Sequence, residues 1–259
     1  MTSVRKLLDL TGKTALVTGG SRGLGLQMAE ALGEMGAKLV LTARKKDELE
    51  EAVARLASMQ IQSFSWVCDI GKREAIAPLV DEVLRKLGKV DILVNNAGAT
   101  WGAPAEDHPL EAWDKLVNVN MTGAFLLSQA FAKKCMIPAK WGRIVNVASV
   151  AGLMGQDPRF AATTAYTATK HGVIGLTRQL AAEWGVHGIT VNAICPGFFP
   201  SKMTKAVLAT VGEQIRDLTP TRRLGNEEDL KGLVVLLASE ASRHITGQAI
   251  VVDGGAVIV

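Results

Sequence analysis

The chain has 259 residues, of which 48% are hydrophobic and 21% are charged. This balance is typical of globular proteins and argues against disorder, and the length suits one domain that spans residues 1–259. The net charge is +4, but no Lys/Arg block is longer than Arg44-Lys45-Lys46, so we expect no nucleic-acid partner.

Taken in chain order, seven short apolar runs predict β-strands. These runs cover residues 13–20, 37–44, 63–70, 90–98, 142–149, 188–197 and 247–255. Because they lack polar–apolar alternation, we expect strands buried on both faces, as in a parallel sheet covered by helices. Amphipathic stretches between the runs predict helices at residues 24–35, 47–59, 73–87, 164–184 and 227–239.

This alternation predicts an α/β protein with a doubly wound, Rossmann-type sheet of seven parallel strands flanked by helices. Ligands of such sheets bind beyond the carboxyl ends of the strands. The residues that end the apolar runs are therefore the candidates for a binding site. They are Gly19 to Gly25, Arg44, Asp69, Asn95 to Gly98, Ser149 and Pro196-Gly197.

A glycine-rich turn, TGGSRGLG, follows the first predicted strand and places Gly19, Gly23 and Gly25 in a GxxxGxG pattern. Glycine allows positive φ and a close approach of the backbone to a diphosphate, and the following helix directs its N–H groups at the anion. The spacing differs from the GxGxxG dinucleotide pattern, and a plain turn between strand and helix is the alternative. Its position in the first βα unit favours a dinucleotide site.

Charge at the end of the second strand distinguishes NADP from NAD. NAD sites place an acidic residue there for the ribose hydroxyls, whereas NADP sites place a cation for the 2′-phosphate. The strand ends in Ala43 and Arg44, with Lys45 next, and Arg22 lies in the glycine turn. We therefore expect NADP(H) to be favoured over NAD(H), the alternative being that both arginines are solvated surface residues.

The only tyrosine of the chain is Tyr166, and Lys170 follows it at helical i, i+4 spacing. The two side chains should share one helical face, above the strand that ends at Ser149. A free phenol has a pKa of about 10, and lowering it by three units takes roughly 4 kcal/mol. We expect the Lys170 ammonium to supply much of that stabilisation. The alternatives are a surface contact for the pair and a capping role for Ser149.

The chain has three widely spaced cysteines, Cys68, Cys135 and Cys195, and no Cys/His cluster. We therefore expect neither a disulfide framework nor a metal site. The opening MTSVRKLLDLTGK has no features of a signal peptide, and no apolar run approaches the roughly 18 residues of a membrane span. The expectation is a cytoplasmic protein with no membrane partner.

Over nearly its whole length the chain resembles the short-chain dehydrogenase/reductase family. The resemblance is carried by Thr18-Gly19-Gly20-Ser21-Arg22-Gly23-Leu24-Gly25, Asp69, Asn95-Asn96-Ala97-Gly98, Asn120, Ser149, Tyr166-x-x-x-Lys170 and Pro196-Gly197. It implies hydride transfer between a nicotinamide coenzyme and a ketone or secondary alcohol. Tyr166 would be the general acid and base, Ser149 would bind the carbonyl oxygen, and Lys170 would hold the nicotinamide ribose. Asn120 would hold a water of a proton relay, or be an ordinary polar helix residue.

The resemblance also implies a set of coenzyme contacts. Asp69 would meet the adenine, the backbone of Phe199 would bind the carboxamide, and the hydroxyls of Ser201 and Thr204 would reach phosphate or be ordinary loop groups. The full set is Gly19, Ser21, Arg22, Gly23, Leu24, Gly25, Arg44, Asp69, Ile70, Asn96, Ala97, Gly98, Tyr166, Lys170, Pro196, Gly197, Phe199, Ser201 and Thr204.

The expected substrate pocket is mostly apolar. Its residues would be Trp101, Ser149, Met154, Phe160, Tyr166, Phe198 and Met203. Within the family the chain is similar to bacterial 3-oxoacyl reductases and gluconate 5-dehydrogenases, and the apolar lining favours a 3-oxoacyl thioester or another apolar ketone over a sugar acid. Tyr166 follows Ser149 by seventeen positions, more than the dozen or so common in the family, which weakens any inference about substrate.

An interpretation from another class is a catalytically weak NADPH-binding sensor or scaffold, although all four catalytic positions are present. Family resemblance further implies a homotetramer, assembled through the helices that contain Asn120 and Tyr166 and through the C-terminal strand. The apolar ending GGAVIV would suit that interface, or pack on its own subunit.

Overall fold

The computed structural model describes residues 2–157 and 162–259. Seven strands form one parallel sheet in the order β3-β2-β1-β4-β5-β6-β7, which confirms the predicted Rossmann-type fold. The strands are β1 Thr14–Thr18, β2 Lys38–Ala43, β3 Ser63–Val67, β4 Ile92–Asn95, β5 Gly142–Val147, β6 Ile189–Pro196 and β7 Ala249–Val252. The strand order reverses between β1 and β4, which is where sheets of this kind bind their ligands.

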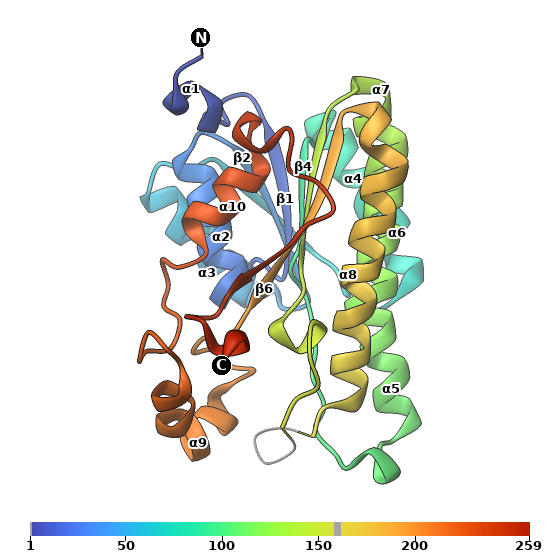
Figure 1. Ribbon diagram of the computed structural model, residues 1–259. Helices are drawn as coiled ribbons and strands as arrows, with labels where there is room; N and C mark the ends of the chain where they lie inside the picture. The colour runs from blue at the N-terminus through green and yellow to red at the C-terminus, as the bar shows by residue number, and fades with distance from the viewer. Residues whose placement is uncertain (1, 158–161) are drawn as a thin grey trace.

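Helices cover both faces of the sheet (Figure 1). One face carries α2 Gly23–Glu34, α3 Lys46–Ser58 and α10 Lys231–Ala238, and the other carries α4 Ile76–Leu87, α6 Gly123–Phe131 and α8 Thr164–Trp184. The remaining α-helices of the described chain are α1 Val4–Leu8, α5 Leu110–Leu116, α7 Ile137–Ala139 and α9 Lys205–Leu218. None of the helices within the described ranges is long and apolar enough to span a membrane.

The central strands are buried because both faces are covered. In β1, Leu16 packs into the core under α4 and α6, whereas Ala15 and Val17 pack into the core under α2 and α10. Successive side chains of a strand point to opposite faces, so a strand between two helical layers is buried at every position and mostly apolar. The continuous apolar runs therefore confirm the expected covered sheet.

The prediction that every strand is buried on both faces is wrong for strand β3. It lies at the edge of the sheet and pairs only with β2, and Trp66 and Val67 are 40% and 49% exposed. Two predicted helices also begin later than expected. Residues 73–75 form a 3₁₀ turn before α4, and the last of the predicted helices begins at Lys231.

A long helical segment runs from α5 through α6 to α7 and contains two π-helical stretches. These are Val117–Thr122 and Ala132–Met136. π-helical turns leave the regular i to i−4 pattern and are frequent at functional sites. The first stretch contains Asn120, which it places beside the carboxyl ends of the central strands.

Candidate active site

A cleft of about 450 Å³ lies at the carboxyl ends of the central strands. It is lined by every residue predicted to contact the coenzyme, including the glycine turn after β1, Arg44 after β2 and Pro196-Gly197 at the end of β6. Ser149, Tyr166 and Lys170 line the same cleft. The fold thus brings these segments together, while the role of each residue stays a prediction.

The glycine turn fits a bound diphosphate. Gly19 and Gly23 have φ values of 64° and 55°, which favour glycine. A Cβ atom at Gly25 would clash with the Gly19 carbonyl oxygen and with the Asn96 side chain, whereas at Gly23 it would meet nothing within 4 Å. The first turn of α2 has no acidic residue and no side-chain cap. The N–H groups of this turn are therefore available to an anion in the cleft.

Hydrogen bonds join this turn to the end of β4. The Asn96 side chain donates to the carbonyl oxygens of Thr18 and Gly19 at 2.9 and 3.2 Å. The N–H groups of Asn96 and Ala97 donate to Thr18 Oγ1, both at 3.0 Å. The side-chain amide of Asn96 thus fixes the turn. Any contact of Asn96 with a ribose would therefore be made by its backbone rather than by its side chain. The sequence analysis did not predict that the Thr18 hydroxyl binds the end of β4. The only indication was that Thr18 belongs to the glycine-rich motif.

Tyr166 in α8 and Ser149 line the same cleft, and the Ser149 side chain opposes, as a hydrogen-bonding neighbour, the rise that burial causes in the pKa of the phenol. Ser149 Oγ also accepts from the Ala151 N–H at 3.1 Å, so it caps the 3₁₀ turn Val150–Gly152 as well as contacting the phenol. The capping alternative is therefore met at Ser149, whereas its predicted contact with a substrate carbonyl oxygen stays a prediction. The cap fixes the direction of the Ser149 side chain.

Lys170 is bound differently from the expectation. Its Nζ donates to the Val147 carbonyl oxygen at 2.6 Å and lies 5.5 Å from the centre of the Tyr166 ring. Burial lowers the pKa of Lys170 to about 8, and the electrostatic interaction with Cys195 opposes this shift. Burial raises the pKa of Tyr166, and the hydrogen bond with Ser149 opposes that shift.

The expectation that Lys170 depresses the pKa of the phenol is therefore not met by the protein groups alone. The cost of burying a phenolate exceeds the stabilisation that Ser149 provides. Lys170 adds little because its ammonium group is directed to a backbone carbonyl. In this environment the phenol stays protonated at neutral pH.

Asn120 is buried next to the catalytic candidates and does not belong to the described lining of the cleft. Its side chain accepts from the Ala99 N–H at 2.8 Å and donates to the Ala99 carbonyl and to Thr169 Oγ1, both at 3.0 Å. A Cβ atom at Gly98 would lie 3.3 Å from Asn120 Oδ1 and 3.8 Å from Lys170 Nζ. The two side chains thus approach one point, but both N–H groups of Asn120 are already used.

The predicted substrate residues divide into two groups. Met203 lines the cleft with Ser149 and Tyr166. Trp101, Met154 and Phe198 belong to the loops after β4, β5 and β6 but are not among the lining residues of the described chain. Trp101 and Met154 are 44% and 43% exposed. The predicted contact at Phe160 lies outside the described residues.

The loop after β6 closes one end of the cleft. Thr204 Oγ1 donates to the Phe199 carbonyl at 2.6 Å and accepts from the Ser201 N–H at 3.0 Å. Ser201 Oγ in turn accepts from the Thr204 N–H at 3.2 Å. Both hydroxyls therefore hold the loop, which supports the alternative that they are ordinary loop groups, although both still line the cleft.

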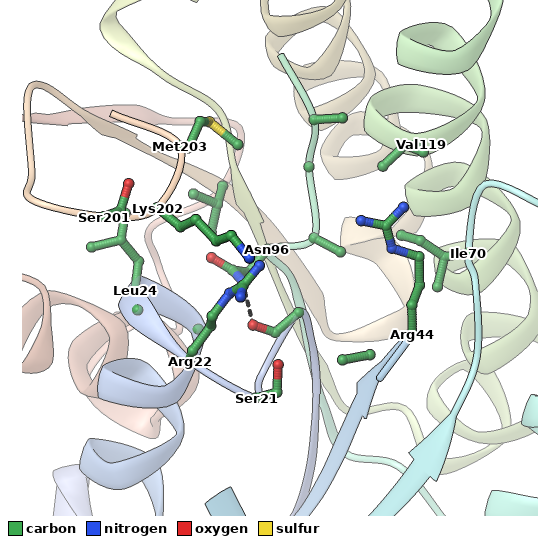
Figure 2. Close-up of a pocket in the computed structure, with 18 of the residues that line it drawn as sticks. Ser21, Arg22, Leu24, Arg44, Ile70, Asn96, Val119, Ser201, Lys202 and Met203 are labelled. Atoms are coloured by element: carbon green, nitrogen blue, oxygen red, sulfur yellow. Dashed lines mark hydrogen bonds between the residues drawn. The ribbon is translucent and has the colours of Figure 1, made fainter. Parts of the chain in front are cut away.

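Charged side chains surround one end of the cleft. Figure 2 shows Arg22 and Lys202 extending into it, whereas Arg44 extends towards Ile70 and Val119. Glu48 also lines the cleft, from the first turn of α3. The sequence interpretation missed both Lys202 and Glu48. Only their position in the sequence could have indicated them, because each lies a few residues beyond a strand end that was predicted to contribute to the binding site.

Comparison with known proteins identifies the class. The model of the short chain dehydrogenase family matches residues 13–212. The chain belongs to this family, and it is an NAD(P)-dependent oxidoreductase of the kind that acts on CH–OH groups and ketones.

Its relatives differ in substrate. The chain is 38% identical over 253 residues to gluconate 5-dehydrogenase of Gluconobacter oxydans, with 96% of each chain covered. It is 37% identical to a 3-oxoacyl-(acyl-carrier-protein) reductase of Staphylococcus epidermidis, with 94% of this chain and 98% of that protein covered. A solved gluconate 5-dehydrogenase from Burkholderia cenocepacia, in complex with NADP and tartrate, is 32% identical with a TM-score of 0.93, covering 99% and 100% of the two chains.

Proposed function

We propose that the protein is an NADP(H)-dependent reductase of an apolar ketone, such as a 3-oxoacyl thioester, with Tyr166 as the general acid and, in the reverse direction, the general base. The observation that carries the proposal is that Tyr166, Ser149 and Lys170 line the same cleft as the glycine turn. An acid, a second hydroxyl and an anion site in one cleft suit hydride transfer to a carbonyl group.

Different residues of the cleft would bind different parts of the coenzyme. The N–H groups at the start of α2 would hold the diphosphate of a dinucleotide, Arg22 and Arg44 the 2′-phosphate, and Lys170 the nicotinamide ribose. When bound, the reduced nicotinamide supplies the hydride. Gly23 leaves open space beside the backbone at the start of α2, which fits a coenzyme approaching there.

Tyr166 would donate its proton to the carbonyl oxygen of the ketone as negative charge develops there. The raised pKa keeps the phenol protonated at neutral pH, which is the state that reduction requires. Ser149 would donate a hydrogen bond to the same oxygen and fix its position. Lys170, with a pKa of about 8, would exchange protons readily and help to restore the phenol after each turnover.

The preference for NADP(H) is supported by the cations of the cleft. Arg22, Arg44, Lys45 and Lys202 all line it. A related gluconate 5-dehydrogenase structure contains NADP. A 2′-phosphate carries close to two negative charges at neutral pH, so several cations at one end of the cleft favour it over a ribose hydroxyl.

Met203 in the lining of the cleft and exposed apolar side chains on the neighbouring loops support an apolar ketone. Trp101, Met154 and Met203 are each more than 40% exposed, on the loops after β4, β5 and β6. The first of these loops is held against the segment before α8, because the Ala103 N–H donates to the Ala162 carbonyl at 2.9 Å. The gluconate 5-dehydrogenases among the relatives make a sugar acid the second candidate.

The test is an NADPH-oxidation screen over 3-oxoacyl thioesters, apolar ketones and 5-ketogluconate, with Tyr166→Phe as the control. Turnover of an apolar ketone that is lost in the variant supports the proposal. Faster turnover of 5-ketogluconate would assign the sugar-acid activity instead. Tight NADPH binding with no turnover of any substrate would favour the sensor or scaffold interpretation.

We also infer a homotetramer located in the cytoplasm. Exposed apolar side chains support assembly through the helices and the C-terminal end, where Leu110 and Trp113 of α5 are 68% and 38% exposed and Ile258 and Val259 are 81% and 83% exposed. A sizing column would give four times the monomer mass if this inference holds, and the monomer mass if it fails.

A further inference from the structure

An acidic side chain lies among the cations expected to bind the coenzyme phosphate. Glu48 Oε1 lies 2.7 Å from Arg22 Nη1 and 3.1 Å from Lys45 Nζ, and Ser21 Oγ lies 3.5 Å from Oε2. The Glu48 side chain is 20% exposed, whereas those of Arg22 and Lys45 are 48% and 56% exposed. The less exposed carboxylate is thus held between two partly exposed cations.

The surroundings keep this carboxylate charged. Burial raises the pKa of Glu48, but the hydrogen bond from Lys45 and the charges of Arg22, Lys45 and Lys202 outweigh it and hold the pKa below its ordinary value. Arg22 therefore has a negative partner in the cleft before any coenzyme arrives. A 2′-phosphate that binds Arg22 has to replace that partner.

We propose that Glu48 determines the coenzyme selectivity of this cleft by competing with the 2′-phosphate of NADP(H) for Arg22 and Lys45, and by accepting a hydrogen bond from the ribose hydroxyl of NAD(H). The proposal rests on the proposed dinucleotide-binding function. A phosphate of nearly two negative charges is repelled by a carboxylate that shares its cation, whereas a ribose hydroxyl is a donor that a carboxylate binds. Glu48 therefore reduces the preference that the cations create and lets the cleft accept both coenzymes.

The test is calorimetric titration of NADPH and NADH into the wild-type protein, Glu48→Gln and the control Glu50→Gln. Glu50 lies on the same helix, pairs with Lys46 at 3.6 Å and is 64% exposed. In Glu48→Gln we expect NADPH to bind about tenfold more tightly, which is about 1.4 kcal/mol, and NADH about threefold more weakly. Glu50→Gln should stay within about twofold of wild type for both coenzymes.

A second comparison isolates the competition for Arg22. In an Arg22→Gln background, the gain in NADPH affinity from Glu48→Gln should fall to less than about threefold, because the contested cation is gone. An unchanged gain would overturn the competition, and so would a Glu48→Gln protein that binds NADPH more weakly or with an unchanged NADPH/NADH ratio. Circular dichroism confirms that the variants are folded. A wild-type protein that binds neither coenzyme would instead refute the proposed function.

Discussion

Lys170 Nζ lies 5.5 Å from the centre of the Tyr166 ring and is hydrogen-bonded to the Val147 carbonyl rather than to the phenol. The i, i+4 spacing places both side chains on one face of α8, as expected, but the end of β5 receives the ammonium group. The lysine is thereby fixed between helix and sheet. Burial lowers its pKa to about 8.

The first prediction concerns the pH dependence of activity. Because Lys170 loses its proton near pH 8, kcat/KM for NADPH should decline above that pH as the cation expected to hold the ribose is lost. Initial rates from pH 6 to 10 measure the decline. Lys170→Arg should move it to higher pH, since guanidinium stays charged. A decline at an unchanged pH in that variant would mean that another group titrates.

Stability should also depend on Lys170. Its folded pKa of about 8 lies below the ordinary value of 10.5, so the unfolded chain binds more protons between these pH values. The free energy of unfolding should therefore rise with pH through this window, by up to about 3 kcal/mol. The destabilisation from burying the charged lysine is fully present below pH 8 and is lost as the pH rises through the window. Urea unfolding at pH 7 and 9.5 should show that rise in wild type and a smaller one in Lys170→Met. The exposed substitution Lys133→Met serves as control, and equal slopes in all three proteins would refute the prediction.

Tyr166→Phe should separate chemistry from binding. Removing the proton donor should lower ketone reduction by about 10² to 10⁴-fold, the usual contribution of a general acid. NADPH affinity, measured by fluorescence titration, should change by less than about threefold because the glycine turn and the cations are untouched. A variant that reduces ketones at the wild-type rate would remove Tyr166 from the mechanism.

Two glycine substitutions should have opposite effects. Gly25→Ala places a Cβ against the Gly19 carbonyl and Asn96, so we expect a loss of about 1–3 kcal/mol in stability and weaker NADPH binding. Gly175→Ala lies on the exposed face of α8, where a Cβ meets nothing within 4 Å, and should gain up to about 1 kcal/mol. Thermal unfolding and NADPH titration measure both. Similar effects at the two positions would contradict the packing argument.

A buried polar network behind the site should be sensitive to truncation. Asn146 accepts from the Asn95 amide at 2.9 Å and donates to Thr177 Oγ1 at 2.9 Å, and all three residues are buried. Asn146→Ala should cost about 1–3 kcal/mol, because it leaves buried polar groups without partners. Urea unfolding tests this, with the exposed Gln179→Ala as control. A loss equal to that of the control would show that the network adds nothing.

The fold was predictable because its signals are local. The central strands are mostly apolar and are buried at every position because they lie between two helical layers. Tyr166 and Lys170 share a helical face because of their i, i+4 spacing. The exposure of Trp66 was not predictable from its run. That exposure depends on β3 lying at the sheet edge, which is a property of strand order.

The lining of the cleft by the predicted coenzyme contacts was predictable, whereas, among the described residues, Asn120 and several of the predicted substrate residues do not line it. The electrostatics of the cleft were not predictable. Strand ends and motifs brought the cleft residues together, whereas the direction of the Tyr166 pKa shift depends on the depth of burial, which no spacing reveals. Glu48 was missed for a similar reason. The sequence has no acidic residue at the end of β2. The chain then turns into α3, and the first turn of this helix places Glu48 in the lining of the cleft.

The strand reversal between β1 and β4 divides the cleft between two parts of the chain. In the proposed function, selectivity for the nucleotide would rest on β1, β2, α2 and α3, while proton transfer would rest on β5 and α8. Substitutions in the first part would therefore change whether the enzyme uses NADP(H) or NAD(H) without changing the residues proposed for catalysis. Laboratory evolution could address the two properties in succession, with effects that combine independently.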